Sequence, residues 1–270
     1  GGSNRRDRER MNFALQNTAI DPIHQFQVTK WLDLSIGGVD ISFTNASGFM
    51  LLGVVLCIAF FGYAASKKAL VPGRTQSMAE IGYGFVADMV RSTAGEEGLR
   101  FFPFVFTLFF FVFFANMIGM VPYAFTTTSH LVVTGALAML VISIVIGFGI
   151  WKNGLSFFKL FAPSGAPFLI YLILVPIEII SFLARPVTLA LRLFANMLAG
   201  HIMLKLFATF AAQLIGAALS GAVFMGVVGL LAFGMGVALN ALELLVAGLQ
   251  AYVFAILTCV YLNDALHPSH

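Results

Sequence analysis

The chain has 270 residues, of which 60% are hydrophobic and only 10% are charged, and its mean hydropathy is +0.95. Soluble domains carry roughly a quarter charged residues, so this composition excludes a soluble globular protein and indicates an integral membrane protein. The formal net charge of +3 is small and unclustered, which argues against a nucleic-acid-binding protein. Cys57 and Cys259 each lie in an apolar run without metal-ligand spacing, so we interpret both as small hydrophobic residues.

The first ten residues differ in composition from all that follows, and Met11 comes directly after them. They lack the apolar core of a cleavable signal peptide. We therefore interpret residues 1–10 as a non-native or disordered extension, and residues 11–270 as a single membrane domain. Residues 11–47 mix polar and apolar side chains, which predicts a short amphipathic or irregular segment at the membrane surface.

Three apolar runs have the length that crosses a bilayer, about 20 residues. They predict spans over residues 48–66, 101–121 and 130–151. The phenylalanine-rich part of the second run is expected to serve lipid or helix packing. Residues 76–100 alternate charges with apolar positions 81, 85, 86, 89 and 90, which predicts an amphipathic helix along the membrane surface.

Two long hydrophobic stretches follow, over about residues 167–212 and 218–262. Each would exceed ~60 Å as a straight helix, about twice the hydrocarbon thickness. We predict two strongly tilted, bent helices joined near residues 216–221; four ordinary spans are the alternative. Pro176 and Pro186 would bend the first helix. Four glycines would allow close approach of neighbouring backbones to the second: Gly226, Gly229, Gly234 and Gly236.

The expected fold is therefore an all-α polytopic membrane protein with about five membrane-embedded helices and one surface helix. Lysines and arginines border the first span and follow the third, at Lys67, Lys68, Arg74, Lys152 and Lys159. The positive-inside rule then places residues 67–100 and 151–166 in the cytoplasm and the N-terminus outside. Five passes leave the C-terminus in the cytoplasm.

The stretch from residue 178 to residue 205 carries charges inside this apolar half of the chain. Glu178, Arg185 and Arg192 are spaced by seven residues, so they return to nearly the same side of a helix. The intervening polar residues on that face are Ser181, Thr188 and Asn196. A charge at the bilayer centre costs at least ~2.5–3.5 kcal/mol. This polar stripe therefore indicates a path through the membrane, although Arg185 alone has two interpretations, a channel role or bracing of Glu178 at an interface.

The last long helix carries a second polar face. Asn240, Glu243 and Gln250 are spaced by three and seven residues. His201 lies nine residues after Arg192, about half a turn away, so the two should point to opposite sides of their helix. A histidine and a glutamate on neighbouring helices can form a proton relay, because both titrate near neutral pH when buried. Lys205 is expected to support this face from an interface.

Residues 191–201, Leu-Arg-Leu-Phe-Ala-Asn-Met-Leu-Ala-Gly-His, resemble the signature of subunit a of the F-type ATP synthase. The likeness extends to residues 116–122 with 128–131 and to residues 243–254, and it covers the chain from the first span to Asp264. The arginine motif is highly specific, and the other motifs are moderately so. The resemblance implies the proton-channel subunit of the membrane Fo sector, which has no catalytic site and no cofactor of its own.

The resemblance also implies roles for single residues. The arginine that matches Arg192 faces the ring of c subunits and prevents a short-circuit between two proton half-channels. Five further residues match positions that line or border those channels: Glu178, Asn196, His201, Glu243 and Gln250. Possible supporting residues are Arg185, Asn240, Lys205 and Ser181. Some members exchange the acid and the histidine of the His201–Glu243 pair, and this chain has the mitochondrial-type order.

The implied partners are the c-ring, the peripheral-stalk b subunits and the lipid bilayer, with protons as the transported ion. The implied location is the bacterial inner membrane, with the mitochondrial inner membrane as the alternative. A proton-coupled secondary transporter is the main rival interpretation, but it should show internal repeats, and we find none in the sequence. A non-conducting anchor would have no need of the polar stripes. Phosphate-binding loops, catalytic Ser/His/Asp sets and metal-ligand clusters are absent from the sequence.

Overall fold

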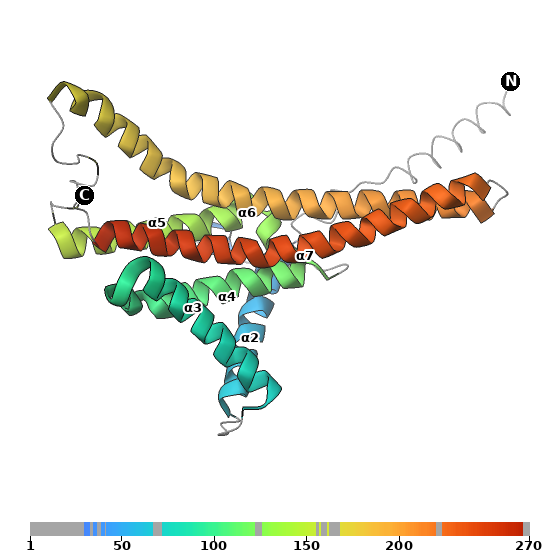
Figure 1. Ribbon diagram of the computed structural model, residues 1–270, viewed down its shortest axis with the longest axis horizontal. Helices are drawn as coiled ribbons and strands as arrows, with labels where there is room; N and C mark the ends of the chain where they lie inside the picture. The colour runs from blue at the N-terminus through green and yellow to red at the C-terminus, as the bar shows by residue number, and fades with distance from the viewer. Residues whose placement is uncertain are drawn as a thin grey trace.

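The computed structural model describes residues 30–32, 35–36, 39–40, 42–66, 72–121, 126–154, 157, 161, 168–219 and 223–266. The predicted extension over residues 1–10 lies outside this described part. Within it, the chain is dominated by helices, and those from Phe102 onward lie roughly along one long axis (Figure 1). The predicted division into a terminal extension and one membrane domain therefore stays a prediction.

Six α-helices and two short 3-10 helices make up most of the described residues. They are α2 (Asn45–Ser66), α3 (Arg74–Gly98), η2 (Leu99–Phe101), α4 (Phe102–Gly119), η3 (Thr127–Ser129), α5 (Leu131–Asn153), α6 (Phe168–Leu219) and α7 (Val223–Leu266). Within the described ranges, five helical segments are long and apolar enough to cross a membrane, with α3, η2 and α4 forming one of them. The predicted fold class, including two long C-terminal helices, is confirmed.

Four very short strands precede α2 and were not predicted. β1 (Lys30–Leu32) pairs antiparallel with β4 (Phe43–Thr44), and β2 (Ser35–Ile36) pairs antiparallel with β3 (Val39–Asp40). The sequence between β2 and β3 is Gly37-Gly38, a pair typical of two-residue hairpin turns. That glycine pair was the available signal, and strands of two residues carry too little alternation to be recognised otherwise.

The two long helices divide close to the predicted junction, because α6 ends at Leu219 and α7 begins at Val223. α6 has 52 residues and α7 has 44. At 1.5 Å per residue both are about twice as long as the hydrocarbon thickness, so neither can stand upright in a bilayer. The early part of α6, which contains Pro176 and Pro186, diverges from α7 (Figure 1).

Close packing of α6 on α7 uses two of the four predicted glycines. A Cβ on Gly229 would lie 3.0 Å from the backbone nitrogen of Ile215, and one on Gly226 would lie 3.0 Å from Ala218 Cβ. A Cβ on Gly234 would meet nothing within 4 Å, so the prediction was wrong there. Gly226 and Gly229 both lie in the part of α7 next to its junction with α6.

The core lies where α4 and α5 pack against α7. Val105, Val112, Val141, Val145 and Phe254 are completely or almost completely buried in it. The phenylalanine-rich α4 also packs on α2 through edge-to-face rings. The packing role predicted for this run is therefore confirmed for its inward-facing rings.

The apolar stripe predicted on α3 is only half correct. Val86, Met89 and Val90 are buried against the bundle, but Ile81 is 72% exposed and Phe85 is exposed as well. The first half of α3 still packs beside the end of α2, and the exposed Phe85 still contacts the rings of Phe109 and Tyr252. Periodicity identified a helix with an apolar face, but it could not show which residues of that face would be buried.

Candidate functional site

α6 separates its charged residues onto two faces, as predicted. Leu189, Leu193 and Met197 are buried on the side that packs against the bundle. Arg192 is exposed, whereas His201 is buried on the packed side. Arg192 and His201 are half a turn apart on the helix. Arg192 therefore faces the outside of the subunit, and His201 faces its inside.

Arg192 has no hydrogen bond or ion pair with any residue in the described part of the chain. Its neighbours one turn away on the same face of α6 are the uncharged Thr188 and Asn196, which are also exposed. An uncompensated guanidinium on a membrane-embedded surface is unfavourable. The isolated subunit therefore presents a charge that calls for a partner from another chain or from water.

The other members of the predicted polar stripe also lie away from the core. Glu178 is half-buried, and Ser181 and Thr188 are exposed. Asn196 lies one turn after Arg192, and its Nδ2 donates a hydrogen bond to Gln250 Oε1 at 3.1 Å. The stripe therefore runs along the edge of α6 that borders α7, and Asn196 links the two helices across that edge.

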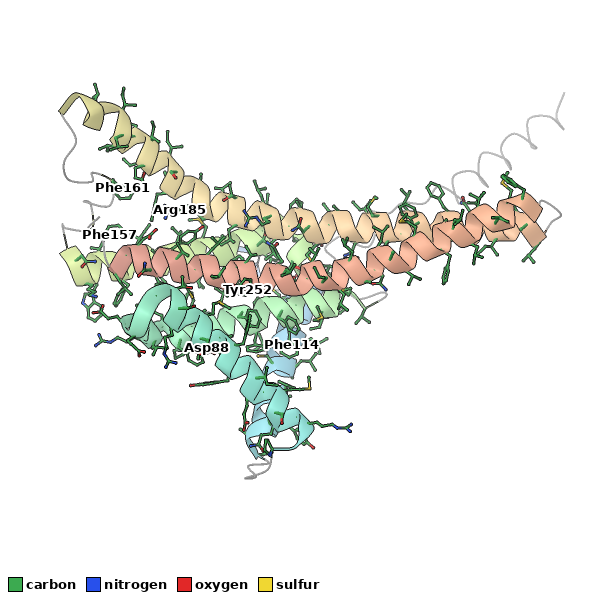
Figure 2. The ribbon with its side chains drawn as sticks, viewed as in Figure 1. Asp88, Phe114, Phe157, Phe161, Arg185 and Tyr252 are labelled. Atoms are coloured by element: carbon green, nitrogen blue, oxygen red, sulfur yellow. The ribbon has the colours of Figure 1, made fainter. Side chains whose placement is uncertain are left out.

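Arg185 pairs with Asp264 rather than with Glu178. Arg185 Nη1 lies 2.8 Å from Asp264 Oδ2, and both side chains are 29% exposed. The guanidinium also lies 5.4 Å from the ring centre of Tyr261, within the range of a cation–π contact. Figure 2 shows Arg185 on α6 in the region where that helix begins to leave α7. The pair thus joins the two helices where they diverge, and a channel role of Arg185 stays a prediction.

Two amides are buried at the centre of the bundle. Gln250 is buried, and its Nε2 has no protein partner among the described residues. Asn116 of α4 donates from Nδ2 to the carbonyl of Ala247 at 3.0 Å, so it ties α4 to α7. Asn116 therefore links two helices of the bundle. Gln250 keeps an unused donor beside the Asn196 contact.

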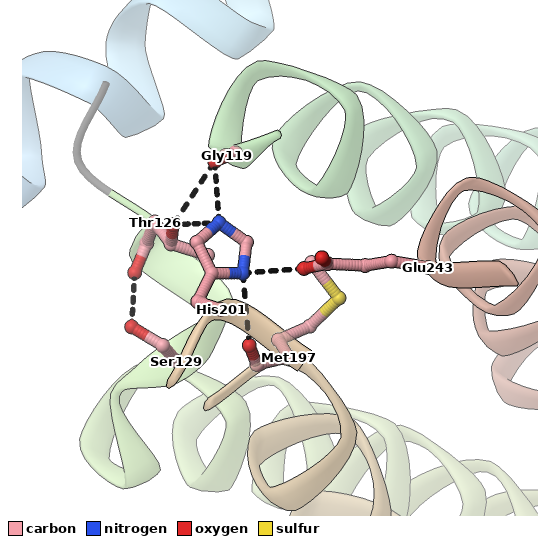
Figure 3. A network of polar contacts seen from close by, with 6 residues as sticks. All are labelled: Gly119, Thr126, Ser129, Met197, His201 and Glu243. Carbon is pink, nitrogen blue, oxygen red and sulfur yellow. Dashed lines mark hydrogen bonds and ion pairs between the residues drawn. The ribbon is translucent and has the colours of Figure 1, made fainter. Parts of the chain in front are cut away.

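His201 and Glu243 form a buried pair between α6 and α7. His201 Nδ1 lies 2.5 Å from Glu243 Oε1, and the two residues are 9% and 3% exposed. The same nitrogen lies 3.0 Å from the carbonyl of Met197. On the other side of the ring, Nε2 lies 2.6 Å from the carbonyl of Gly119 (Figure 3). The predicted relay residues are thus in direct contact.

The surrounding oxygens determine where the protons of this pair reside. A carbonyl oxygen only accepts, so Nε2 must carry a proton that it donates to Gly119. Nδ1 faces the Met197 carbonyl and the Glu243 carboxyl group, so it donates when the ring is an imidazolium and Glu243 is ionised. Moving the Nδ1 proton to Oε1 neutralises both groups. The proton between these two atoms is the one that the geometry leaves free to move.

Two glycines provide the space for this pair. A Cβ on Gly200 would lie 3.0 Å from both Cδ and Oε1 of Glu243. A Cβ on Gly119 would lie 2.7 Å from Thr126 Cγ2, next to the ring of His201. Both distances are shorter than ordinary contacts between carbon atoms. The glycine before His201 therefore allows the carboxyl group to reach the imidazole.

A cavity of about 540 Å³ opens beside the pair. It lies between the end of α4, the middle of α6 and the first half of α7, and its polar lining residues include His201, Lys205 and Asn240. Its volume is that of many waters, which occupy ~30 Å³ each in the liquid. The cavity brings Lys205 and Asn240 together with His201, and Glu243 is not among its lining residues.

Comparison with known proteins matches residues 47–263 to the family model described as ATP synthase A chain. The chain is 78% identical to ATP synthase subunit a of Hyphomonas neptunium, over 92% of this chain and 97% of that protein. It is 57% identical to ATP synthase subunit a of Mesorhizobium japonicum over 93% of this chain. The Maricaulis maris protein of the same name is 58% identical over 93% of this chain. The chain belongs to the ATP synthase subunit a family.

Membership of the subunit a family confirms the resemblance found in the sequence. It makes this chain a membrane subunit of the synthase complex rather than a catalytic one. The relatives are bacterial proteins, and five segments of the described chain are apolar enough to cross a membrane. Both observations support a multi-pass protein of the bacterial inner membrane.

Sequence reasoning missed three contacts of this subunit a site. Thr126, Asp264 and the carbonyl of Gly119 were not among the candidates, yet they contact His201 or Arg185. Asp264 was named only as the end of the family resemblance, and its charge beside Tyr261 was the available signal. Backbone carbonyls have no sequence signal. Within the described residues, no group of three His, Cys, Asp or Glu side chains is placed to hold a metal ion.

Proposed function

We propose that this chain conducts protons through two half-channels that meet at the c-ring, with Arg192 between them. Membership of the subunit a family supplies the coarser function, the proton channel of the Fo sector. The finer assignment is supported by the positions of the charged side chains on α6 and α7. The c-ring is the partner that family membership implies, and we propose the peripheral-stalk b subunits and lipid as further contacts.

The half-channel from outside would use the cavity and the buried pair. A proton entering the cavity would bind Nδ1 of His201, the ring nitrogen that has no fixed proton, pass to Glu243 Oε1, and continue toward Gln250 and Asn196 at the edge of α7. Asn240 and Lys205 line the entrance. The neutral and the charged forms of the pair keep the same Nε2 proton, so the transfer requires no rotation of the imidazole.

The half-channel to the cytoplasm would use the opposite end of the stripe. Glu178 is half-buried, and Ser181 is exposed one turn later, on the part of α6 that leaves α7. Divergence of the helices gives water a route to Glu178 without crossing the packed interface. The Arg185–Asp264 pair would hold the two helices together at the inner end of that route.

Arg192 would act on the c-ring carboxylates from between the two routes. A neutral carboxyl group can rotate through lipid, whereas an ionised one cannot. At ~4 Å and an effective dielectric constant of 20, the attraction between a guanidinium and a carboxylate is about 4 kcal/mol. A membrane potential of 100 mV supplies ~2.3 kcal/mol per charge. The two energies are comparable, so the contact can both form and break during rotation.

The observation that carries this proposal is an exposed, unpaired arginine on the face of α6 opposite to a buried His–Glu pair. Replacement of Arg192 by alanine should abolish ATP-driven proton pumping by the complex in reconstituted vesicles and leave assembly intact. Arg91→Ala is a matched control, because Arg91 is exposed on α3 and pairs with Glu96. Coupled pumping at the control rate by the Arg192 variant would refute the proposal.

A further inference from the structure

The residues between α4 and α5 supply a side chain to the relay pair. Thr126, Thr127, Thr128 and Ser129 are all buried, and Thr126 is 1% exposed. Thr126 Oγ1 lies 3.0 Å from His201 Nε2, on the side of the ring opposite to Glu243 (Figure 3). Ser129 Oγ donates to the carbonyl of Thr126 at 2.6 Å, which fixes this turn in place.

The direction of the Thr126 hydroxyl follows from its second contact. Its Oγ1 lies 3.2 Å from the carbonyl of Gly119, to which only a donor can bond. The hydroxyl proton is therefore used on Gly119, and the oxygen lone pairs of Thr126 remain to accept from Nε2–H. Nε2 then faces two acceptors, the Gly119 carbonyl and the Thr126 hydroxyl. Each acceptor favours the doubly protonated ring, because hydrogen bonds to a charged donor are the stronger ones.

We propose that Thr126 is a positioning residue that holds the Nε2 proton of His201, so that Nδ1 alone exchanges a proton with Glu243. This proposal rests on the proposed function, because it assigns a role within the outer half-channel. Without the hydroxyl, the ring loses one acceptor and one contact that keeps Nδ1 turned toward Glu243. The His201–Glu243 pair should then lose the proton between Nδ1 and Oε1 at a lower pH, and proton transfer between the two residues should slow.

The charged and titratable groups around this pair are few. α7 contributes Glu243, α6 contributes Lys205 to the same cavity, and η3 is followed directly by His130. α4 has no titratable side chain between Phe102 and Gly119. The hydroxyl of Thr126 is neutral, so its removal changes hydrogen bonding at His201 without changing the charge of any of these groups.

The test is ATP-driven proton pumping by the complete synthase in inverted vesicles, with both sides equilibrated at each pH before ATP is added. Thr126→Val removes the hydroxyl and keeps the side-chain volume. We expect the pH at which pumping is half-maximal on the alkaline side to fall by about one unit. Thr126→Ser keeps the hydroxyl and should retain the original pH profile. Thr258→Val is the matched control, because Thr258 is equally buried but bonds only to the carbonyl of Phe254 in its own helix.

Gly119→Ala is a second variant for the case in which Thr126→Val fails to assemble. Its new methyl group would lie 3.1 Å from Thr126 Oγ1 and should displace the hydroxyl, giving the same acid shift. An unchanged pH profile in either assembled variant, while His201→Leu still blocks pumping, would overturn the role of Thr126 and leave the proposed function standing. Normal pumping by His201→Leu would overturn both.

Discussion

Arg192 and His201 lie on the same helix, yet their surroundings differ in every respect that matters to a charge. Arg192 is exposed, and no residue in the described part of the chain is its partner. His201 is buried, and four oxygen atoms lie within 3.0 Å of its ring nitrogens. The buried group is satisfied inside the subunit, so it can carry a proton without any other chain. The exposed group is unsatisfied, so its action depends on a second chain.

Under the proposed function, this difference allows a short stretch of α6 to serve two tasks. Helical geometry places residues nine positions apart on opposite faces. The inner face can then form a closed network with α4, η3 and α7, while the outer face stays open. We expect variants of the inner network to change the rate and the pH dependence of proton flow. Variants of the outer charge should instead uncouple that flow from rotation.

The largest effect expected within the inner network comes from the relay pair itself. His201→Leu or Glu243→Leu should slow proton flux about 10- to 100-fold, because general acid–base groups contribute at least this much. The measurement is passive proton flow through Fo in stripped membranes. The exchanged double variant His201→Glu with Glu243→His keeps one acid and one imidazole and should regain part of the flux. Flux that is unchanged in both single variants would remove the pair from the path.

A smaller effect is expected at the Arg185–Asp264 pair. Asp264→Asn leaves the partly buried Arg185 without its carboxylate, which should cost about 1–2 kcal/mol, between the values for exposed and buried pairs. The midpoint of thermal inactivation of the complex should fall by a few degrees, while the initial pumping rate changes less. Replacing Asp88, whose contact with Arg91 is exposed, is the control. Equal midpoints for both variants would show that the pair does not hold α6 to α7.

The smallest effect is expected at Gly200. Gly200→Ala places a methyl group 3.0 Å from the Glu243 carboxyl group, which must shift by a few tenths of an ångström. We expect a reduction of proton flux of about threefold, because the distance to Nδ1 lengthens. Gly216→Ala in the same helix meets nothing within 4 Å and should leave flux unchanged. Equal proton flux in the Gly200→Ala and Gly216→Ala variants would mean that the Glu243 carboxyl group has more room than these distances indicate.

Much of the fold could be predicted from the sequence, because apolar length and proline and glycine positions are local signals. The predicted first span over residues 48–66 became Asn45–Ser66, and the predicted junction near 216–221 lies at the end of α6. The opposite faces of Arg192 and His201 followed from helical periodicity alone. The stripe on α3 was half wrong, because Ile81 and Phe85 are exposed while Val86, Met89 and Val90 are buried.

The candidate site was predictable only for side chains that break the apolar pattern. Glu243 and His201 stood out as polar residues in apolar helices, and the structure brings them together. Thr126 did not stand out, because a threonine in a short link is unremarkable until its contact 75 residues away is known. The partner of Arg185 lies 79 residues further along the chain. Such pairings depend on how whole helices pack, which no local spacing specifies.

The central claim is that Arg192 faces the rotor, and a map of the assembled synthase tests it most directly. The measured quantity is the distance from the Arg192 guanidinium to the nearest ring carboxylate. We predict ~4 Å or less for the carboxylate that is passing between the two half-channels, the range in which the attraction is a few kcal/mol. An Arg192 side chain turned away from the ring and paired among helices of its own subunit would contradict the account.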